Sequence, residues 1–162
     1  MITVVATGGF DPIHSGHINY LKEAALSGTR LVVGVNSDEW LSRKKGRSFM
    51  PWEERAAIVR ELACVDDVIS FDDSDNSAIH ALEQVKLYYP NDRIVFVNGG
   101  DRTSDNIPEM SVEGVEFEFG IGGNDKANSS SWILKEWANL QSNVSGVHIL
   151  YLLKTDNGPL KN

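Results

Sequence analysis

Two histidines, His14 and His17, stand three residues apart near the start of the chain. They lie in the segment from Gly8 to His17, which reads Gly-Gly-Phe-Asp-Pro-Ile-His-Ser-Gly-His. At this spacing both imidazoles can face the same point from one helical turn. The two leading glycines allow a tight turn that approaches a ligand closely, and Gly16 is expected at a helix start, where unpaired N–H groups attract anions. We therefore interpret the segment as a turn that binds phosphate groups.

Other uses of these residues find less support in the chain. A histidine pair can be half of a zinc site, but no cluster of cysteine, histidine or aspartate supplies the other ligands. The dinucleotide-binding pattern Gly-x-Gly-x-x-Gly is absent, and so is the Walker A pattern that ends in Gly-Lys-Ser or Gly-Lys-Thr. His80 and His148 stand alone, as ordinary surface or core histidines do. We expect no metal ion held by protein side chains.

Short apolar runs alternate with helical patterns, and this alternation predicts the elements that must position the turn. Strands are expected at residues 2–6, 31–35, 67–71, 93–97 and 115–119. Helices are expected directly after the turn, from Pro51, over residues 77–88 and over residues 129–140. The helix from Pro51 should bury Ala56, Ala57, Ile58 and Leu62.

The predicted fold class is α/β, a single Rossmann-like three-layer α/β/α sandwich with a mainly parallel five-stranded sheet. Residues 1–140 should form one domain, and residues 141–162 an extension that packs on it or frays. Ligands of such sheets bind at the carboxyl ends of the strands. Loops after Ala6, Asn36, Val97 and Gly120 meet at this edge and carry glycine, basic or hydroxyl residues. A ligand site is therefore expected there.

A basic cluster follows the second predicted strand, in a chain that is otherwise acidic. The net charge is −8, which argues against general binding of nucleic acid. The cluster consists of Arg43, Lys44, Lys45 and Arg47. We expect it to form a solvated loop at the same sheet edge, where it would attract a small polyanion.

The remaining composition is that of a globular enzyme. Hydrophobic residues make up 41% and charged residues 23% of the chain. No run of eighteen apolar residues could cross a membrane, and the N-terminus lacks the basic region of a signal peptide. The one cysteine, Cys64, lies in an apolar stretch and is expected to be a buried small hydrophobe. These features predict a cytoplasmic protein.

The segment from Gly8 to His17 resembles the HxGH signature of the nucleotidylyltransferase superfamily, which includes cytidylyltransferases and adenylyltransferases. The resemblance implies that His14 and His17 contact a nucleoside triphosphate and stabilise charge on its phosphates during transfer. It also implies a nucleotide-binding set in the turn, which comprises Gly8, Gly9, Phe10, Asp11 and Gly16. Such an enzyme joins a nucleotidyl group to a small phosphorylated substrate and releases pyrophosphate, with Mg²⁺ carried by the triphosphate.

The resemblance continues beyond the first strand. Asn36-Ser37-Asp38 and the basic cluster match the segment in which a lysine reaches the triphosphate and the second substrate. Lys44 is the predicted catalytic lysine, and Asp38, Lys45 and Arg47 are predicted to bind substrate. Arg55 matches an arginine that faces the substrate phosphate. The alternative for Arg55 is a surface arginine paired with a nearby glutamate.

Two later segments also match the family. The turn Asn98-Gly99-Gly100-Asp101 implies that Gly100 and Asp101 lie near the nucleoside. Ser129, Ser130 and Ser131 occupy the place of the family's Ser-Thr-Thr motif at the last helix, where hydroxyls and free N–H groups suit the β- and γ-phosphates. The alternative is a plain helix cap, for which one serine would suffice.

Two departures separate the chain from glycerol-3-phosphate cytidylyltransferases. Ala63 and Lys126 stand where those relatives have arginines, and lysine lacks the planar fork that grips two oxygens. The chain looks more like the heptose-phosphate adenylyltransferase domain of ADP-heptose synthases. This resemblance favours ATP with a heptose-like sugar 1-phosphate over CTP with glycerol 3-phosphate.

Two rival functions use the same pocket. One is a nucleotide sensor without catalysis, which would not need to keep His14, His17, Lys44 and the serines. The other is a hydrolase, but the chain shows no candidate base to activate water. Trp132 and Trp137 could form a homodimer face or complete the core.

Overall fold

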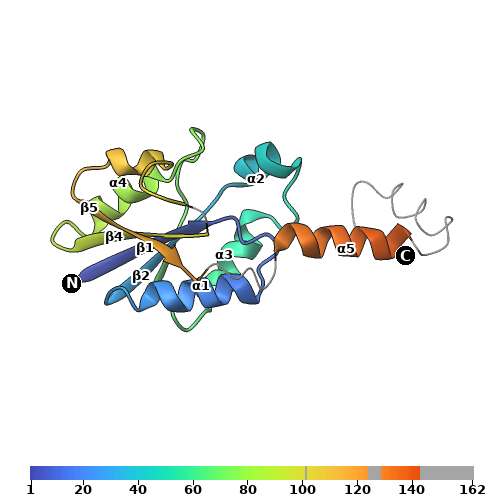
Figure 1. The fold of residues 1–162 in the computed structure, drawn as a ribbon, viewed down its shortest axis with the longest axis horizontal. Coiled ribbons are helices and arrows are strands. Elements are labelled where there is room, and N and C mark those ends of the chain that lie inside the picture. Colours follow the sequence, from blue (N-terminus) through green and yellow to red (C-terminus); the bar gives the residue numbers. More distant parts are fainter. Residues whose placement is uncertain (101, 124–128, 143–162) are drawn as a thin grey trace.

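The computed structural model describes residues 1–100, 102–123 and 129–142, which form a five-stranded sheet with the order β3-β2-β1-β4-β5. Every neighbouring pair of strands is parallel. The strands are β1 (Ile2–Gly8), β2 (Arg30–Val35), β3 (Asp67–Ile69), β4 (Arg93–Gly99) and β5 (Val115–Ile121). All five predicted strands are present, and the Rossmann-like α/β fold class is confirmed (Figure 1).

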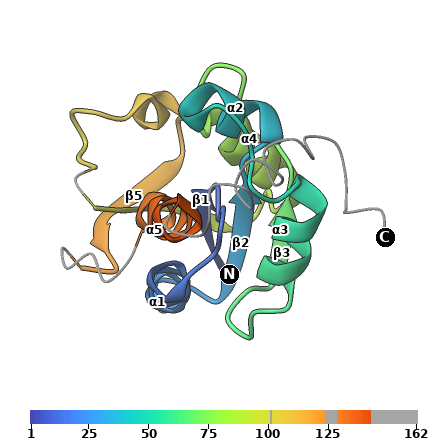
Figure 2. The same ribbon diagram turned by 90° about the vertical axis from the view of Figure 1, so that its right-hand side faces the viewer.

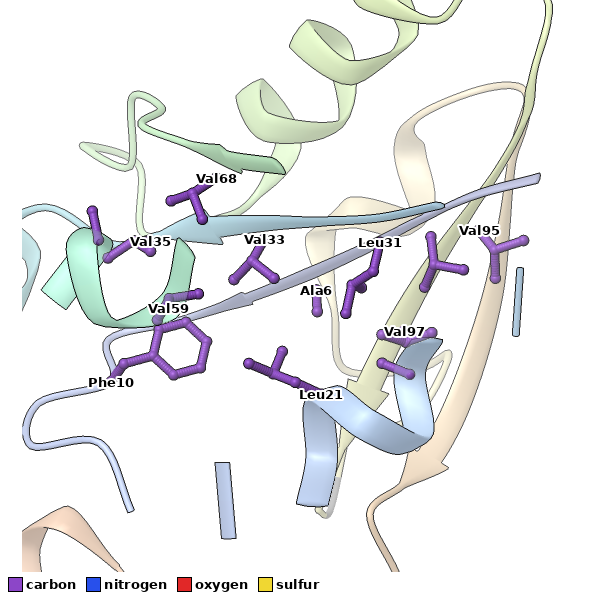
Figure 3. Packing of buried hydrophobic residues seen from close by; sticks show 13 residues of the cluster. Ala6, Phe10, Leu21, Leu31, Val33, Val35, Val59, Val68, Val95 and Val97 are labelled. Atoms are coloured by element: carbon purple, nitrogen blue, oxygen red, sulfur yellow. The ribbon is translucent and has the colours of Figure 1, made fainter. Parts of the chain in front are cut away.

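Helices cover both faces of the sheet, because the strands are apolar on both sides. On one face, α1 (Ser15–Ala25) and α3 (Trp52–Arg60) pack against Val4, Val33 and the other residues of one core cluster. Phe10, Leu21 and Val59 lie against the strand valines in this layer (Figure 3). On the other face, α4 (Ile79–Tyr88) and the short 3₁₀ helix η1 (Pro108–Ser111) enclose a second cluster.

The basic cluster does not form the predicted solvated loop. Arg43, Lys44 and Lys45 are the last turn of a helix, α2 (Asp38–Lys45), and only Arg47 lies beyond it. Ser37 caps this helix, since its hydroxyl accepts a hydrogen bond from the Trp40 amide at 3.0 Å. Acidic residues in the first turn and basic residues in the last complement the helix dipole, so the charges stabilise a helix.

The predicted buried face of α3 is also wrong in part. The structure buries Arg55, Ala56 and Val59, whereas Ile58 is 38% exposed. The helix is therefore rotated relative to the apolar pattern, and an arginine points into the protein. This rotation follows from the contacts of Arg55, which are described below.

Helix α5 (Ser130–Ser142) extends away from the sheet along the long axis of the molecule (Figure 1), and Figure 2 looks down it. None of its described residues is buried. The predicted extension, residues 141–162, lies outside the described residues except for its first two positions. No helix of the described part is long and apolar enough to cross a membrane.

Candidate nucleotide-binding site

A cavity of about 800 Å³ opens at the carboxyl ends of the central strands, as the sequence predicted for a ligand site. It receives residues from the β1–α1 turn, α2, the end of β4, the β5–α5 segment and the segment directly before α4. The predicted site residues that line it are Gly8, Gly9, Phe10, His14, Gly16, His17, Lys44, Gly100, Ser129, Ser130 and Ser131. The structure thus brings together residues more than a hundred positions apart in the chain.

The two histidines are oriented by the backbone at the start of α1. His14 Nδ1 accepts a hydrogen bond from the Gly16 amide at 3.1 Å, and His17 Nδ1 accepts one from the His14 amide at 3.2 Å. Their rings lie 3.9 Å apart between centroids. Because Nδ1 is the acceptor in both rings, the neutral imidazoles carry their protons on Nε2. Each neutral ring therefore carries its donor at Nε2.

His17 is held in its neutral form. Burial, followed by repulsion from His14, lowers the pKa of His17 to about 4. The edge of its ring meets Phe10, with 5.1 Å between centroids. His17 can therefore donate to a phosphate oxygen at neutral pH without carrying a positive charge of its own.

Asp11 lies inside the protein and is not among the residues that line the described cavity. Its carboxylate accepts hydrogen bonds from the Phe49 and Met50 amides, both at 2.7 Å, and pairs with Lys45 Nζ at 2.8 Å. Burial alone would raise the pKa of Asp11, but these hydrogen bonds lower it. Asp11 and Lys45, predicted to contact nucleotide and substrate, instead bind each other and fix the turn to the loop after α2.

Arg55 is also turned inward, with 0% of its surface exposed. Its guanidinium donates to the Gly9, Asn36 and Met50 carbonyls at 2.7–3.0 Å and to Asp38 at 2.6 Å. The alternative of a surface arginine paired with glutamate is therefore wrong. Like Arg55, the predicted site residues Asp38 and Arg47 are not among the residues that line the described cavity, and Arg47 is exposed. In this arrangement Arg55 holds the backbone of the strand ends in place.

Lys44 differs from its neighbour Lys45, because it is exposed and lines the cavity. Its ammonium lies 4.5 Å from the centre of the Trp40 ring, a cation–π contact that orients the side chain. Trp40 lines the cavity as well. The basic cluster therefore presents one lysine to the cavity and uses the next to hold the turn.

The three serines line the cavity in different ways. Ser129 accepts a hydrogen bond from the Trp132 amide at 3.3 Å and so caps α5. Ser130 donates to the Pro12 carbonyl at 2.8 Å, which connects α5 to the β1–α1 turn. Ser129 thus serves as the helix cap that the alternative interpretation required, while Ser130 and Ser131 remain in the cavity lining. Asp101 and Lys126 lie outside the described residues.

Several residues that line the cavity were missed by the sequence analysis. Tyr20 donates from its hydroxyl to the Val97 carbonyl at 3.0 Å, and burial raises its pKa, so it remains a donor. Asn98 was seen only as part of a glycine turn, although the alternation of β4 indicates which face its side chain takes. Asn36 and Glu109 were seen only as parts of segments that resemble the family, and other missed residues are Asn19, Asn76, Ser77 and Arg102.

Known proteins share both the sequence pattern and the fold. The model of the cytidylyltransferase-like family matches residues 5–145. The bifunctional protein HldE of Alcanivorax borkumensis is 40% identical over 125 residues, which cover 76% of this chain and 24% of that protein. The HldE protein of Streptomyces coelicolor is 41% identical over 113 residues, or 68% of this chain and 23% of that protein. The chain thus spans about a quarter of the length of these curated relatives.

Solved structures agree with this relationship. A lipopolysaccharide core biosynthesis protein from Thermoplasma volcanium is 27% identical, with a TM-score of 0.59 over 77% of this chain and 99% of that one. A bifunctional NMN adenylyltransferase/ADP ribose pyrophosphatase from Francisella tularensis shares the fold, with a TM-score of 0.62, 14% identity, and coverage of 85% of this chain and 41% of that one. The chain belongs to the cytidylyltransferase-like family and is a nucleotidyltransferase.

Proposed function

We propose that the chain transfers AMP from ATP to a heptose-like sugar 1-phosphate and releases pyrophosphate. The observation that carries the proposal is the pair His14 and His17, both oriented by backbone amides and both lining the cavity. Similarity to the HldE proteins and to the lipopolysaccharide core biosynthesis protein supports a sugar phosphate as the acceptor.

The geometry suits a reaction that depends on alignment and charge stabilisation. The attacking oxygen of a sugar phosphate is already anionic, so the step needs no strong general base. In the proposed complex, His14 and His17 donate to the oxygens of the α-phosphate, where charge increases during transfer. Lys44 and the start of α5, with Ser130 and Ser131, neutralise the departing pyrophosphate.

A divalent ion would enter this site with the nucleotide. Within residues 1–100, 102–123 and 129–142, no group of three or more His, Cys, Asp or Glu side chains could hold a metal ion. We therefore include Mg²⁺ in the proposal as part of the triphosphate substrate. When bound, Mg²⁺ would offset phosphate charge.

Location and assembly complete the proposal. The cytoplasm supplies nucleoside triphosphates, and the net charge of −8 favours a small substrate over nucleic acid. Trp132, Trp137 and Leu140 of α5 are each more than half exposed, which supports a homodimer contact through this helix. Light scattering on the purified chain would measure its mass in solution, and a monomer at all concentrations would remove the dimer from the proposal.

The test is pyrophosphate release in the presence of Mg²⁺. ATP and CTP are each combined with a panel of sugar 1-phosphates and polyol phosphates, and reactions without acceptor serve as controls. Release that requires both ATP and a sugar 1-phosphate is the expected result. Release with CTP and glycerol 3-phosphate would show that these two compounds, and not ATP and a sugar 1-phosphate, are the substrates. Nucleotide binding without turnover across the panel would instead indicate a sensor, and release of orthophosphate without an acceptor would indicate a hydrolase.

A further inference from the structure

The cavity has two chemically different sides, which the alternation of β4 defines. Val97 packs in the core cluster beneath α1, whereas Phe96 packs in the cluster beneath α4. Successive strand residues point to opposite faces, so the side chain of Asn98 lies on the α4 side. The α1 side carries His14 and His17, while the segment directly before α4 contributes Asn76 and Ser77 to the lining.

Two buried polar atoms on the α4 side lack a partner. Asn98 is 6% exposed and Glu109 is 3% exposed, and both residues line the cavity. Within the part of the chain that the structure describes, neither Asn98 Nδ2 nor Glu109 Oε2 has a hydrogen-bond partner. Buried polar atoms are nearly always paired in folded proteins, because leaving one unpaired is costly. A donor and an acceptor are thus available to a ligand.

The acceptor atom is held firmly in position. The other oxygen of the same carboxylate, Glu109 Oε1, accepts a hydrogen bond from the Ala78 amide at 2.7 Å, directly before α4. This contact fixes the carboxylate against the helix start, and Oε2 is fixed with it. A rigid, buried acceptor discriminates well between ligands that can donate to it and ligands that cannot.

The charges indicate which part of a substrate belongs on this side. Lys44 and Arg102, two cations of the lining, are exposed, whereas the Glu109 carboxylate is buried. A carboxylate repels a phosphate but accepts readily from a hydroxyl group. An amide N–H donor such as Asn98 Nδ2 can donate to a hydroxyl oxygen, so the two groups together suit a ligand with more than one hydroxyl group.

We infer that the α4 side of the cavity recognises the hydroxyl groups of the acceptor's sugar, with Glu109 Oε2 accepting from one hydroxyl and Asn98 Nδ2 donating to another. This inference rests on the proposed function, because it assigns the specificity of the same site. Hydroxyl groups of the nucleotide's ribose share this chemistry, and the experiment separates the two sources.

The principal variant is Glu109→Gln, which keeps an oxygen for the Ala78 amide but removes the charged acceptor. Calorimetry measures binding of mannose 1-phosphate and of inorganic phosphate, which share the phosphate and differ in the hydroxyl-rich ring. We expect the wild type to bind mannose 1-phosphate more tightly than inorganic phosphate. In Glu109→Gln the ratio of these two affinities should fall by about tenfold or more. Asn98→Leu, which removes the donor at similar size, should lower this ratio as well.

The matched control is Glu113→Gln, an isosteric change at an exposed position of the same segment, which should leave both affinities unchanged. Thermal melting verifies that all three variants fold. The inference would be overturned if both site variants still preferred mannose 1-phosphate. It would also be overturned if Glu109→Gln bound inorganic phosphate more tightly than the wild type, because phosphate would then lie beside the carboxylate. If the site variants lost as much affinity for ATP as for mannose 1-phosphate, Glu109 and Asn98 would be assigned to the ribose of the nucleotide instead.

The binding measurement does not depend on turnover. Absence of pyrophosphate release with every acceptor would count against the proposed function, while the binding preference would still support or overturn the role of Glu109. Where an acceptor does turn over, its KM should rise in Glu109→Gln by about tenfold, with the KM for ATP unchanged.

Discussion

The β1–α1 turn and the start of α5 both contribute residues to the cavity lining, but they are held very differently. The turn is fixed by buried contacts, with Asp11 bound to Lys45 and to two backbone amides, and with Arg55 bound to the Gly9 carbonyl. The start of α5 is joined to the turn by a hydrogen bond from Ser130 to Pro12, and the helix buries none of its described residues.

This difference indicates how the site divides its work. In the proposed complex the histidines donate to the oxygens of the reacting phosphate, which requires one geometry, and a turn held rigidly before any ligand binds would provide it. The proposed contacts of the serines with the other phosphates can be made from several positions, so a looser attachment would suffice. Breaking the contacts of the two regions in turn should therefore produce effects of different kinds and sizes.

The largest expected effect comes from Lys45→Met, because it leaves the buried Asp11 carboxylate without its cation. Loss of one partner of a buried pair should lower the free energy of unfolding by about 3 kcal/mol. The adjacent Lys44→Met is the matched control, since Lys44 is exposed, and it should change stability by less than about 1 kcal/mol while weakening nucleotide binding. Urea denaturation measures the stability of both variants. Equal losses of stability in Lys45→Met and Lys44→Met would show that the Asp11–Lys45 pair does not hold the turn.

His17→Ala tests the chemistry of the rigid region. It removes one donor from the proposed transition state and should lower turnover by about 100-fold while leaving the fold largely intact. Loss of the hydrogen bond that His17 accepts from the His14 amide should lower the free energy of unfolding by only about 1 kcal/mol. Steady-state pyrophosphate release measures the effect, with the exposed His80→Ala as control. Turnover close to that of the wild type would contradict the proposed role of the histidine pair.

The neutral state of His17 gives the rigid region a pH dependence. Its pKa is about 4 in the folded protein and 6.5 without burial, so the unfolded chain binds more protons between these values. Stability should therefore decrease as the pH falls through this window, by about 2 kcal/mol between pH 7 and pH 5. Urea denaturation across this range should show a steeper loss for the wild type than for His17→Gln. Parallel curves would mean that His17 titrates normally.

The smallest expected effect belongs to the loosely held region. Ser130→Ala removes the hydrogen bond to the Pro12 carbonyl and should raise the KM for nucleotide about fivefold, the equivalent of about 1 kcal/mol. Stability should hardly change, because the surrounding helix is exposed. Ser142→Ala, at the other end of α5, is the control, since its hydroxyl donates to the Asn139 carbonyl of the same helix. A loss of activity as large as that of His17→Ala would show that both regions are equally critical.

The sequence predicts those parts of the molecule that depend on local rules. Strand periodicity is local, and so the sheet was predicted correctly. The turn from Gly8 to His17 is local as well, and the structure places His14 and His17 in the cavity lining, whereas their roles stay predictions. Helix α2 was missed, although Ser37 at its start, acidic and then basic residues along it, and Gly46 after it are recognisable helix signals.

The remaining errors concern side chains whose partners are distant. Lys44 and Lys45 are chemically identical in the sequence, and only the inward position of Asp11 separates their roles. Arg55 contacts backbone carbonyls, which carry no sequence signal, and it therefore broke the apolar pattern of α3. Glu109 meets Ala78 across 31 residues, and no local pattern indicates that contact.

The buried Arg55 also couples the assembly of the site to the folding of the whole domain. Its guanidinium joins α3 to the ends of β1 and β2, which lie up to 46 positions away along the chain. These contacts require the ends of β1 and β2 to lie together and α3 to be docked, so Arg55 can hold the turn in this shape only when all three elements are in place. A partly unfolded chain that releases α3 would lose these contacts with the turn in the same step.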